Sequence, residues 1–127
     1  MNPKTRTVII HINDNFHRRL LCGDIAKMVN ISPSRLRHMF KAETGRSLAR
    51  HVKSIRIEKA KELLETTFFS VKEVMAKVGM SDESHFVRDF KKECGMTPSQ
   101  YRVVSSIARR AQLNGHGANQ QARASVN

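Results

Sequence analysis

One pattern of residues occurs twice in this chain, and it constrains the fold more than any other feature. In each copy a short apolar helix pattern is followed by a tight turn, a second helix pattern and a glycine. At an offset of fifty residues the second copy repeats five positions of the first, namely Leu36/Phe86, Phe40/Phe90, Glu43/Glu93, Gly45/Gly95 and Ser47/Thr97. At an offset of forty-nine, Val74 and Val78 repeat Ile25 and Val29, so the second copy has one extra residue in its turn. Two such units predict a tandem pair of helix-turn-helix motifs.

The turns and helix ends of both copies carry residues that suit them. Gly79 stands in the second turn, where a sharp bend needs a positive φ, and Asn30, the next most tolerant residue, stands in the first. Ser70 and Glu73 have the spacing of a capping box, in which each side chain satisfies a free backbone N–H of the first helical turn. Gly95 is expected to end the second long helix of its copy.

These patterns predict an all-α fold of about seven helices, with two helix-turn-helix subdomains joined by a long linker helix. The first subdomain is expected over residues 1–52, with an opening helix at about 5–17, a scaffold helix at 22–30 and a recognition helix at 33–43. A strand at Val8–Ile10 is the alternative to the opening helix. The linker helix is expected at 48–65, and the second subdomain at 66–105 with its recognition helix at 82–93. Residues 106–127 lose apolar periodicity, so a disordered tail is expected there.

Helical geometry selects the side chains that would face a partner. Advancing 100° per residue from Leu36 and from Phe86 turns polar and basic residues away from the buried face of each recognition helix. Such side chains on a helix can read base edges in the major groove of DNA. The candidate base-contacting residues are Ser34, Arg37, His38, Glu83, Ser84, His85, Val87 and Arg88, and the candidate phosphate-contacting residues are Arg35, Lys41, Arg56, Lys91 and Lys92.

Two of these candidates have alternatives that the sequence leaves open. Arg56 lies on the linker helix, where it could pack between the two units instead of binding a phosphate. Glu83 could accept a hydrogen bond from cytosine, or it could simply favour the positive end of its helix dipole.

The charge of the chain favours a polyanionic partner. The sequence has 23 Lys and Arg against 11 Asp and Glu, a net charge of +12 and a pI near 10.6. Residues 1–52 hold ten basic and three acidic residues, whereas residues 53–102 hold ten and eight. The first subdomain is therefore expected to contribute more of the attraction to DNA. A protein that binds nucleic acid by charge alone, without sequence preference, is the alternative.

The sequence also resembles a known family. The resemblance covers roughly residues 8–102 and is carried by Gly79-Met-Ser-Asp82 with Phe86, Phe90-Lys-Lys92, Gly95-Met-Thr-Pro98, Tyr101-Arg102 and the linker residues Ile55, Arg56, Ile57, Ala60, Leu63 and Leu64. These positions resemble the DNA-binding domain of the AraC/XylS transcription regulators. The resemblance implies sequence-specific binding to double-stranded DNA and control of transcription, often activation through contact with RNA polymerase. Three positions depart from the family pattern: Met75, His51 and Leu21.

Other classes of function find little support. Cys22 and Cys94 are far apart and have no zinc-binding spacing, so no metal, cofactor or enzymatic activity is expected. The chain lacks an apolar run long enough to span a membrane and a signal-peptide core, so a cytoplasmic, nucleoid-associated protein is expected. Because two DNA-binding units lie in one chain, binding as a monomer is possible. No effector domain is recognised, so the chain is expected to be either a stand-alone regulator or the DNA-binding portion of a longer one.

Overall fold

A computed structural model describes the backbone of residues 1–126 and the side chains of residues 1–113. Over this range the chain forms seven α-helices and no strand, which confirms the predicted all-α fold. The helices are α1 (Pro3–Asn15), α2 (Cys22–Met28), α3 (Pro33–Thr44), α4 (Leu48–Thr66), α5 (Val71–Lys77), α6 (Glu83–Cys94) and α7 (Pro98–Val126). The opening segment is helical, so the strand considered at Val8–Ile10 does not form.

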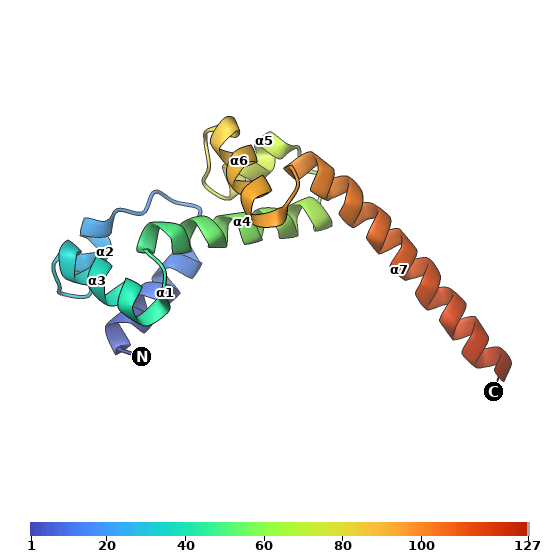
Figure 1. Ribbon diagram of the computed structural model, residues 1–127, viewed down its shortest axis with the longest axis horizontal. Coiled ribbons are helices and arrows are strands. Elements are labelled where there is room, and N and C mark those ends of the chain that lie inside the picture. Colours follow the sequence, from blue (N-terminus) through green and yellow to red (C-terminus); the bar gives the residue numbers. More distant parts are fainter. Residues whose placement is uncertain (127) are drawn as a thin grey trace.

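The long helix α4 carries one subdomain at each of its ends (Figure 1). Helices α1, α2 and α3 lie at its first half, where α3 contacts it, whereas α5, α6 and the beginning of α7 pack against its second half. Each subdomain has its own apolar core. Helix α4 contributes Leu48 to the first core and Ile57, Ala60 and Leu64 to the second. The linker helix is therefore a structural part of both subdomains.

Capping interactions fix the ends of the recognition helices. The Ser32 hydroxyl accepts a hydrogen bond from the Arg35 N–H at 3.1 Å at the start of α3, and Asp82 accepts one from the His85 N–H at 2.9 Å at the start of α6. Both helices end at a glycine with left-handed backbone, at φ 78° for Gly45 and 77° for Gly95. The sequence repeat thus corresponds to a repeat of helix boundaries.

The turn between the two helices of each motif has the expected left-handed residue. Asn30 has φ 58° and Gly79 has φ 81°. The predicted capping box of α5 is also present, because Ser70 and Glu73 each accept a hydrogen bond from the other's backbone N–H. Leu21 begins α2 without a side-chain cap, as its departure from the family pattern suggested.

The structure differs from the sequence expectations at several places. Helix α1 begins at Pro3 because Asn2 caps it and proline is favoured at the first helical position. The helical spacing of residues 22–30 predicts that Met28 faces the core, but this side chain is 45% exposed. The apolar character of Phe68 and Phe69 predicts both in the core, but Phe68 is fully exposed. Phe69 takes the place against the second core, because α4 ends at Thr66 and the chain leaves it in an extended conformation at Thr67.

The sequence predicts a disordered tail over residues 106–127, whereas the backbone of residues 106–126 is helical; residue 127 lies outside the described residues. Helix α7 continues without a break from Pro98 to Val126 and projects away from the two subdomains (Figure 1). The segment contains no proline after Pro98 and is rich in Ala, Gln and Arg, which are good helix formers, and the helix continues through Gly115 and Gly117. Apolar periodicity, the signal used for the prediction, reports packing rather than helix formation.

The two subdomains are held together by the connector between α1 and α2, residues 16–21. Arg56 of α4 donates from Nε to the Phe16 carbonyl at 2.8 Å and from Nη2 to the Arg18 carbonyl at 2.9 Å. Phe16 itself packs against the second core. Gly79 approaches the same connector so closely that a Cβ at this position would lie 2.6 Å from the His17 carbonyl oxygen. These contacts fix how the two motifs are placed relative to each other.

Candidate nucleic-acid interface

Helix α3 divides cleanly into a buried face and an exposed face. Leu36 and Phe40 are fully buried in the first core. The predicted DNA-contacting residues of this helix are all exposed, namely Ser34, Arg35, Arg37, His38 and Lys41. None of the carboxylates in the described side chains forms an ion pair with these residues. Apart from Nη1 of Arg37, which donates to Cys22 Sγ at 3.7 Å, their side-chain hydrogen-bonding groups remain available to a partner.

Helix α6 repeats this division. Phe86 and Phe90 are fully buried and their rings stack with centroids 5.8 Å apart. The predicted contact residues Glu83, Ser84, His85, Arg88, Lys91 and Lys92 are exposed. Val87 is half-buried, so only part of its side chain is available to a thymine methyl group.

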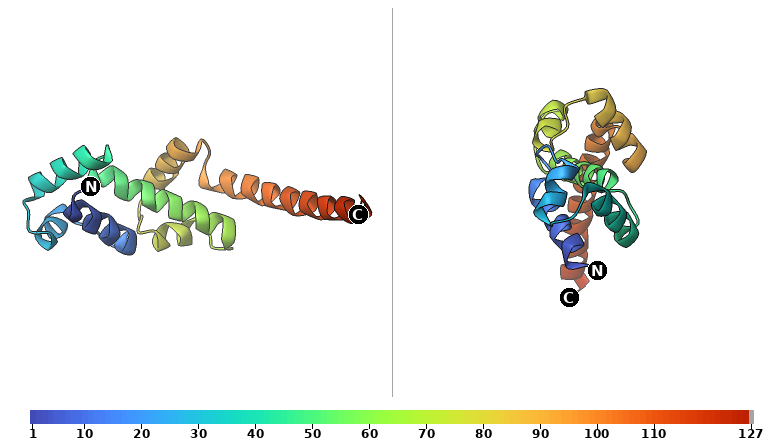
Figure 2. Two further views of the ribbon diagram at one scale, coloured as in Figure 1. Left: turned by 90° about the horizontal axis from the view of Figure 1, so that it is seen from below. Right: turned by 90° about the vertical axis from the view of Figure 1, so that its left-hand side faces the viewer.

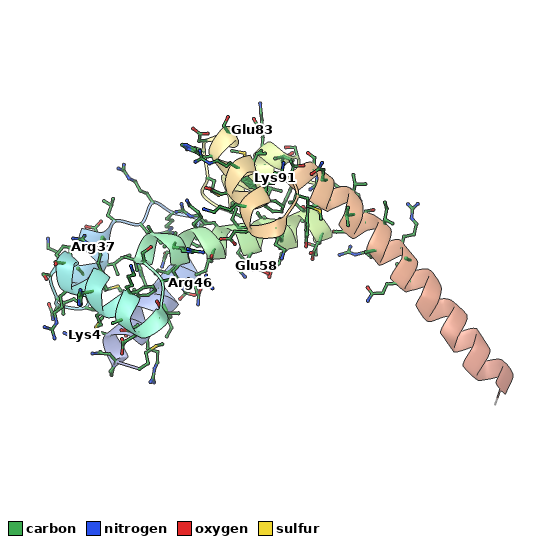
Figure 3. The ribbon with its side chains drawn as sticks, viewed as in Figure 1. Lys4, Arg37, Arg46, Glu58, Glu83 and Lys91 are labelled. Carbon is green, nitrogen blue, oxygen red and sulfur yellow. The ribbon has the colours of Figure 1, made fainter. Side chains whose placement is uncertain are left out.

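The two recognition helices lie on the same side of α4. In the left view of Figure 2, α3 and α6 lie on one side of the green linker helix, whereas α1 and α5 lie on the other. Figure 3 shows Arg37 on α3, and Glu83 and Lys91 near the two ends of α6, while Glu58 lies at the lower edge of α4. A single elongated partner could therefore contact both recognition helices at once.

The acidic residues of α6 are less available than their number suggests. Asp82 caps the helix, and the hydrogen bond from the His85 N–H holds the pKa of its carboxyl below the ordinary value. Asp89 lies 3.4 Å from the Lys53 ammonium and its side chain is only 12% exposed. Glu83 is the remaining acid near the start of the helix, and it is exposed.

The geometry of Arg56, a predicted phosphate contact, favours its alternative role of packing between the two subdomains. Its guanidinium is committed to the carbonyls of Phe16 and Arg18, and burial lowers its pKa from the ordinary value. An arginine that donates two hydrogen bonds inside the protein is poorly placed to follow a phosphate. Of the two roles that the sequence left open for Arg56, these hydrogen bonds favour packing between the two subdomains.

Sequence reasoning missed three basic residues that the fold brings between the recognition helices. A polar hollow of about 1000 Å³ lies there, and its lining includes Arg46, Arg50 and Lys53 together with the predicted Lys41 and Lys92. Arg46 Nη1 donates to Ser54 Oγ at 2.9 Å, and Ser54 Oγ donates to Glu93 Oε1 at 3.0 Å. A cluster of arginines around the capped start of α4 was visible in the sequence, but only the fold places it between α3 and α6.

The described residues offer no sign of a metal centre or a membrane span. They contain no group of three or more His, Cys, Asp or Glu side chains that could hold a metal ion. No helix among them is both long enough and apolar enough to cross a membrane. Cys22 and Cys94 are free thiols, and Cys22 Sγ lies 3.7 Å from Nη1 of Arg37.

Comparisons with known proteins match this geometry. A family model described as a helix-turn-helix domain matches residues 25–103. The arabinose operon regulatory protein of Escherichia coli K12 is 35% identical over 104 residues, which cover 81% of this chain but 36% of that protein. The chain thus spans only about a third of the length of this curated relative. Most relatives are named as transcription regulators, and one is named a bifunctional transcriptional activator and DNA repair enzyme.

Solved structures share the fold. The C-terminal domain of AraT, a response regulator from Geobacillus stearothermophilus, superposes with a TM-score of 0.77 at 35% identity, covering 81% of this chain and 86% of that chain. The DNA-binding domain of AdpA, solved in complex with a target DNA, superposes with a TM-score of 0.80 at 24% identity, covering 87% of this chain and 99% of that chain. At this lower identity the second match supports the fold alone.

Proposed function

We propose that this chain, which belongs to the AraC family of helix-turn-helix transcription regulators, binds double-stranded DNA by inserting α3 and α6 into two adjacent segments of the major groove. One observation carries the proposal: two equivalent helices, each with exposed polar residues, lie on the same side of α4. The net charge of +12 supplies the attraction to a polyanion.

The proposed contacts divide into those that select bases and those that position the duplex. Base edges would be contacted by Ser34, Arg37 and His38 from α3, and by Glu83, Ser84, His85, Val87 and Arg88 from α6. Phosphates would be contacted by Arg35, Lys41, Lys91 and Lys92, joined by Arg46 and Arg50 beside the start of α4. Contacts to phosphate fix register and contribute affinity, whereas contacts to base edges carry the sequence information.

The fixed placement of the two motifs predicts the geometry of the operator. Recognition helices that enter successive turns of one groove require half-sites about one helical turn apart, roughly 34 Å. Because both motifs belong to one chain, a single copy would occupy both half-sites. Unlike the palindromic sites of dimeric regulators, the two half-sites need not be alike, since α3 and α6 present different side chains.

Selection of bound sequences from a random duplex pool tests the proposal. The selected duplexes are expected to share two conserved segments about 10 base pairs apart. A footprint over both segments should persist in an excess of mixed genomic DNA. If mixed DNA removes the footprint completely, the sequence-independent alternative replaces the proposal.

The regulatory part of the proposal is activation of transcription through contact with RNA polymerase, as the family resemblance implies. Transcription in vitro from a promoter carrying the selected site is expected to rise when the protein is added. A fall in transcription from the same promoter would assign repression instead. No catalytic activity forms part of the proposal, because a zinc-thiolate centre needs a cluster of ligands and neither Cys22 nor Cys94 belongs to such a group among the described residues.

A further inference from the structure

A second hollow lies between the two subdomains beside α3, and its walls differ from those of the polar hollow described above. Its volume is about 530 Å³, and it is lined from the connector, α2, α3, α4 and the turn after α5. The walls are aliphatic and are formed mainly by Leu20, Ile25, Leu48, Val52 and Met80. Small-molecule sites typically have volumes of roughly 300–1,000 Å³ and predominantly apolar walls. The size and lining of this hollow suit a small organic ligand.

The rim of this aliphatic hollow is cationic. Arg37, Lys41, Lys53 and Arg56 border it, and its lining residues include no Asp or Glu. Lys53 and Arg56 already have partners in Asp89 and the connector carbonyls. Arg37 and Lys41 form no ion pair with a described carboxylate. Two cations without acidic partners therefore stand beside an apolar space.

We propose that the aliphatic hollow binds a single-chain aliphatic carboxylate. The hydrocarbon chain would lie against Leu20, Val52 and Met80, and the carboxylate would bind Arg37 and Lys41 at the rim. The absence of aromatic rings among the lining residues favours an aliphatic chain over a planar ring. A sugar-phosphate backbone has no hydrocarbon chain that could cover these walls, so the duplex alone does not account for the hollow.

This ligand would regulate DNA binding, an inference that rests on the proposed function. Arg37 is a proposed base contact and Lys41 a proposed phosphate contact. A carboxylate held by both would neutralise them and compete with the duplex. The carboxylate and the operator would therefore each weaken the binding of the other.

Titration calorimetry of the full chain with decanoate, at concentrations at which it forms no micelles, tests the site. Saturable binding of one decanoate per chain is expected. Shortening the ligand to octanoate and hexanoate should weaken binding about fourfold for each methylene lost from the apolar walls. Decanol, which has the same chain without the charge, should bind at least tenfold more weakly. Equal binding of decanol, or no saturable binding of decanoate, would overturn the proposal.

Two variants that fill the hollow locate the site. Val52→Phe places a ring among the aliphatic walls, and Leu20→Trp does the same from the connector. Each is expected to weaken decanoate binding at least tenfold. Val71→Phe is the matched control, because Val71 is also half-buried but lies on α5 in the second subdomain. Decanoate binding that survives in a filling variant with wild-type melting behaviour would contradict the assignment. If Val52→Phe does not fold, Leu20→Trp alone decides.

Competition with a selected duplex tests regulation separately. Decanoate is expected to raise the apparent Kd of the wild-type protein for the duplex and to leave that of Leu20→Trp unchanged. An unchanged wild-type Kd at saturating decanoate would refute the competition. Failure of the protein to bind any duplex specifically, in the absence of decanoate, would instead refute the proposed function, because the calorimetric titration contains no DNA.

Discussion

The ammonium of Lys53 lies 3.4 Å from a carboxylate oxygen of Asp89, which joins the linker helix to the second recognition helix. The Asp89 side chain is only 12% exposed, so its charge is compensated inside the protein. Without this pair, α6 would present Asp82, Glu83 and Asp89 near the phosphate backbone. With it, and with Asp82 engaged as the helix cap, Glu83 is the acid at the start of α6 that most directly opposes a duplex. The first subdomain keeps the larger net positive charge, because the pair engages one cation of the second subdomain as well as one anion.

The first prediction concerns the two arginines of the recognition faces. We expect Arg37→Ala to weaken binding to a selected duplex more than Arg88→Ala, because residues 1–52 hold ten basic residues against three acidic ones. A lost bidentate contact to a base is worth about 1–3 kcal/mol and should relax preference at one base pair. Arg88→Ala should mainly relax sequence preference in the half-site contacted by α6, with a smaller change in total affinity. Titration and footprinting of both variants provide the measurement.

The opposite ranking would identify α6 as the main anchor. If Arg88→Ala abolishes binding while Arg37→Ala is neutral, the distribution of net charge does not determine which subdomain holds the duplex.

The second prediction compares two glycines with nearly the same backbone. Gly79 and Gly95 have φ of 81° and 77°, so alanine at either position adopts a left-handed conformation that costs roughly 1–2 kcal/mol. At Gly95 the added Cβ meets open space, whereas at Gly79 it lies 2.6 Å from the His17 carbonyl oxygen. Gly79→Ala should therefore lower the free energy of unfolding clearly more than Gly95→Ala. Denaturant unfolding of both variants measures the difference, and equal losses would mean that the connector can move away at little cost.

The third prediction separates structural from phosphate-binding cations. Lys92→Ala should reduce the slope of log affinity against log salt by about 0.9, the contribution of one phosphate contact. Arg56→Ala should lower the free energy of unfolding by removing two hydrogen bonds to the connector, with no change in that slope. Binding isotherms over a series of salt concentrations provide the measurement. A reduced slope in a folded Arg56→Ala protein would restore Arg56 to the phosphate contacts.

The fourth prediction concerns pH and His51. The His51 ring packs edge-on against Phe40 at 5.1 Å, its Nε2 is buried without a partner, and burial, followed by the nearby Arg46, lowers its pKa. Below its ordinary pKa of about 6.5 the histidine of the unfolded chain gains a proton that the folded protein resists. Stability is therefore expected to fall as the pH decreases below about 6.5. His51→Phe should reduce this loss, so its stability relative to the wild type should increase from pH 8 to pH 5.

The paired urea-unfolding curves at the two pH values provide the measurement. A constant difference between His51→Phe and the wild type would mean that His51 titrates in the folded state as it does in the unfolded chain.

The sequence predicted the architecture because the fold is specified locally. The repeat, the caps at Ser32 and Ser70 and the glycines at Gly45 and Gly95 each mark a helix boundary through backbone hydrogen bonding. The exposed faces of α3 and α6 followed from helical period alone. The prediction that Phe68 lies in the core was wrong, because the helical periodicity ends where α4 ends. Beyond that point apolar character alone does not determine which of the adjacent residues Phe68 and Phe69 turns inward.

The parts of the site that were missed depend on contacts between distant segments. Arg46 and Arg50 come to lie between the recognition helices only because α4 turns back from the end of α3. Arg56 had two possible roles until the connector carbonyls were placed beside it. The Lys53–Asp89 pair joins residues 36 positions apart, and no periodicity within a helix predicts such a pair.

Helix α4 gives the chain a single cooperative unit of folding. Its 19 residues supply side chains to both apolar cores, and Phe16 from the first subdomain packs against the second core. Loss of either core would leave half of α4 without its partners. An isolated helical segment of about ten residues is marginal in water. The backbone amides in the middle of α4 should therefore exchange with solvent hydrogen only when the whole molecule opens, although each motif resembles a small domain of its own.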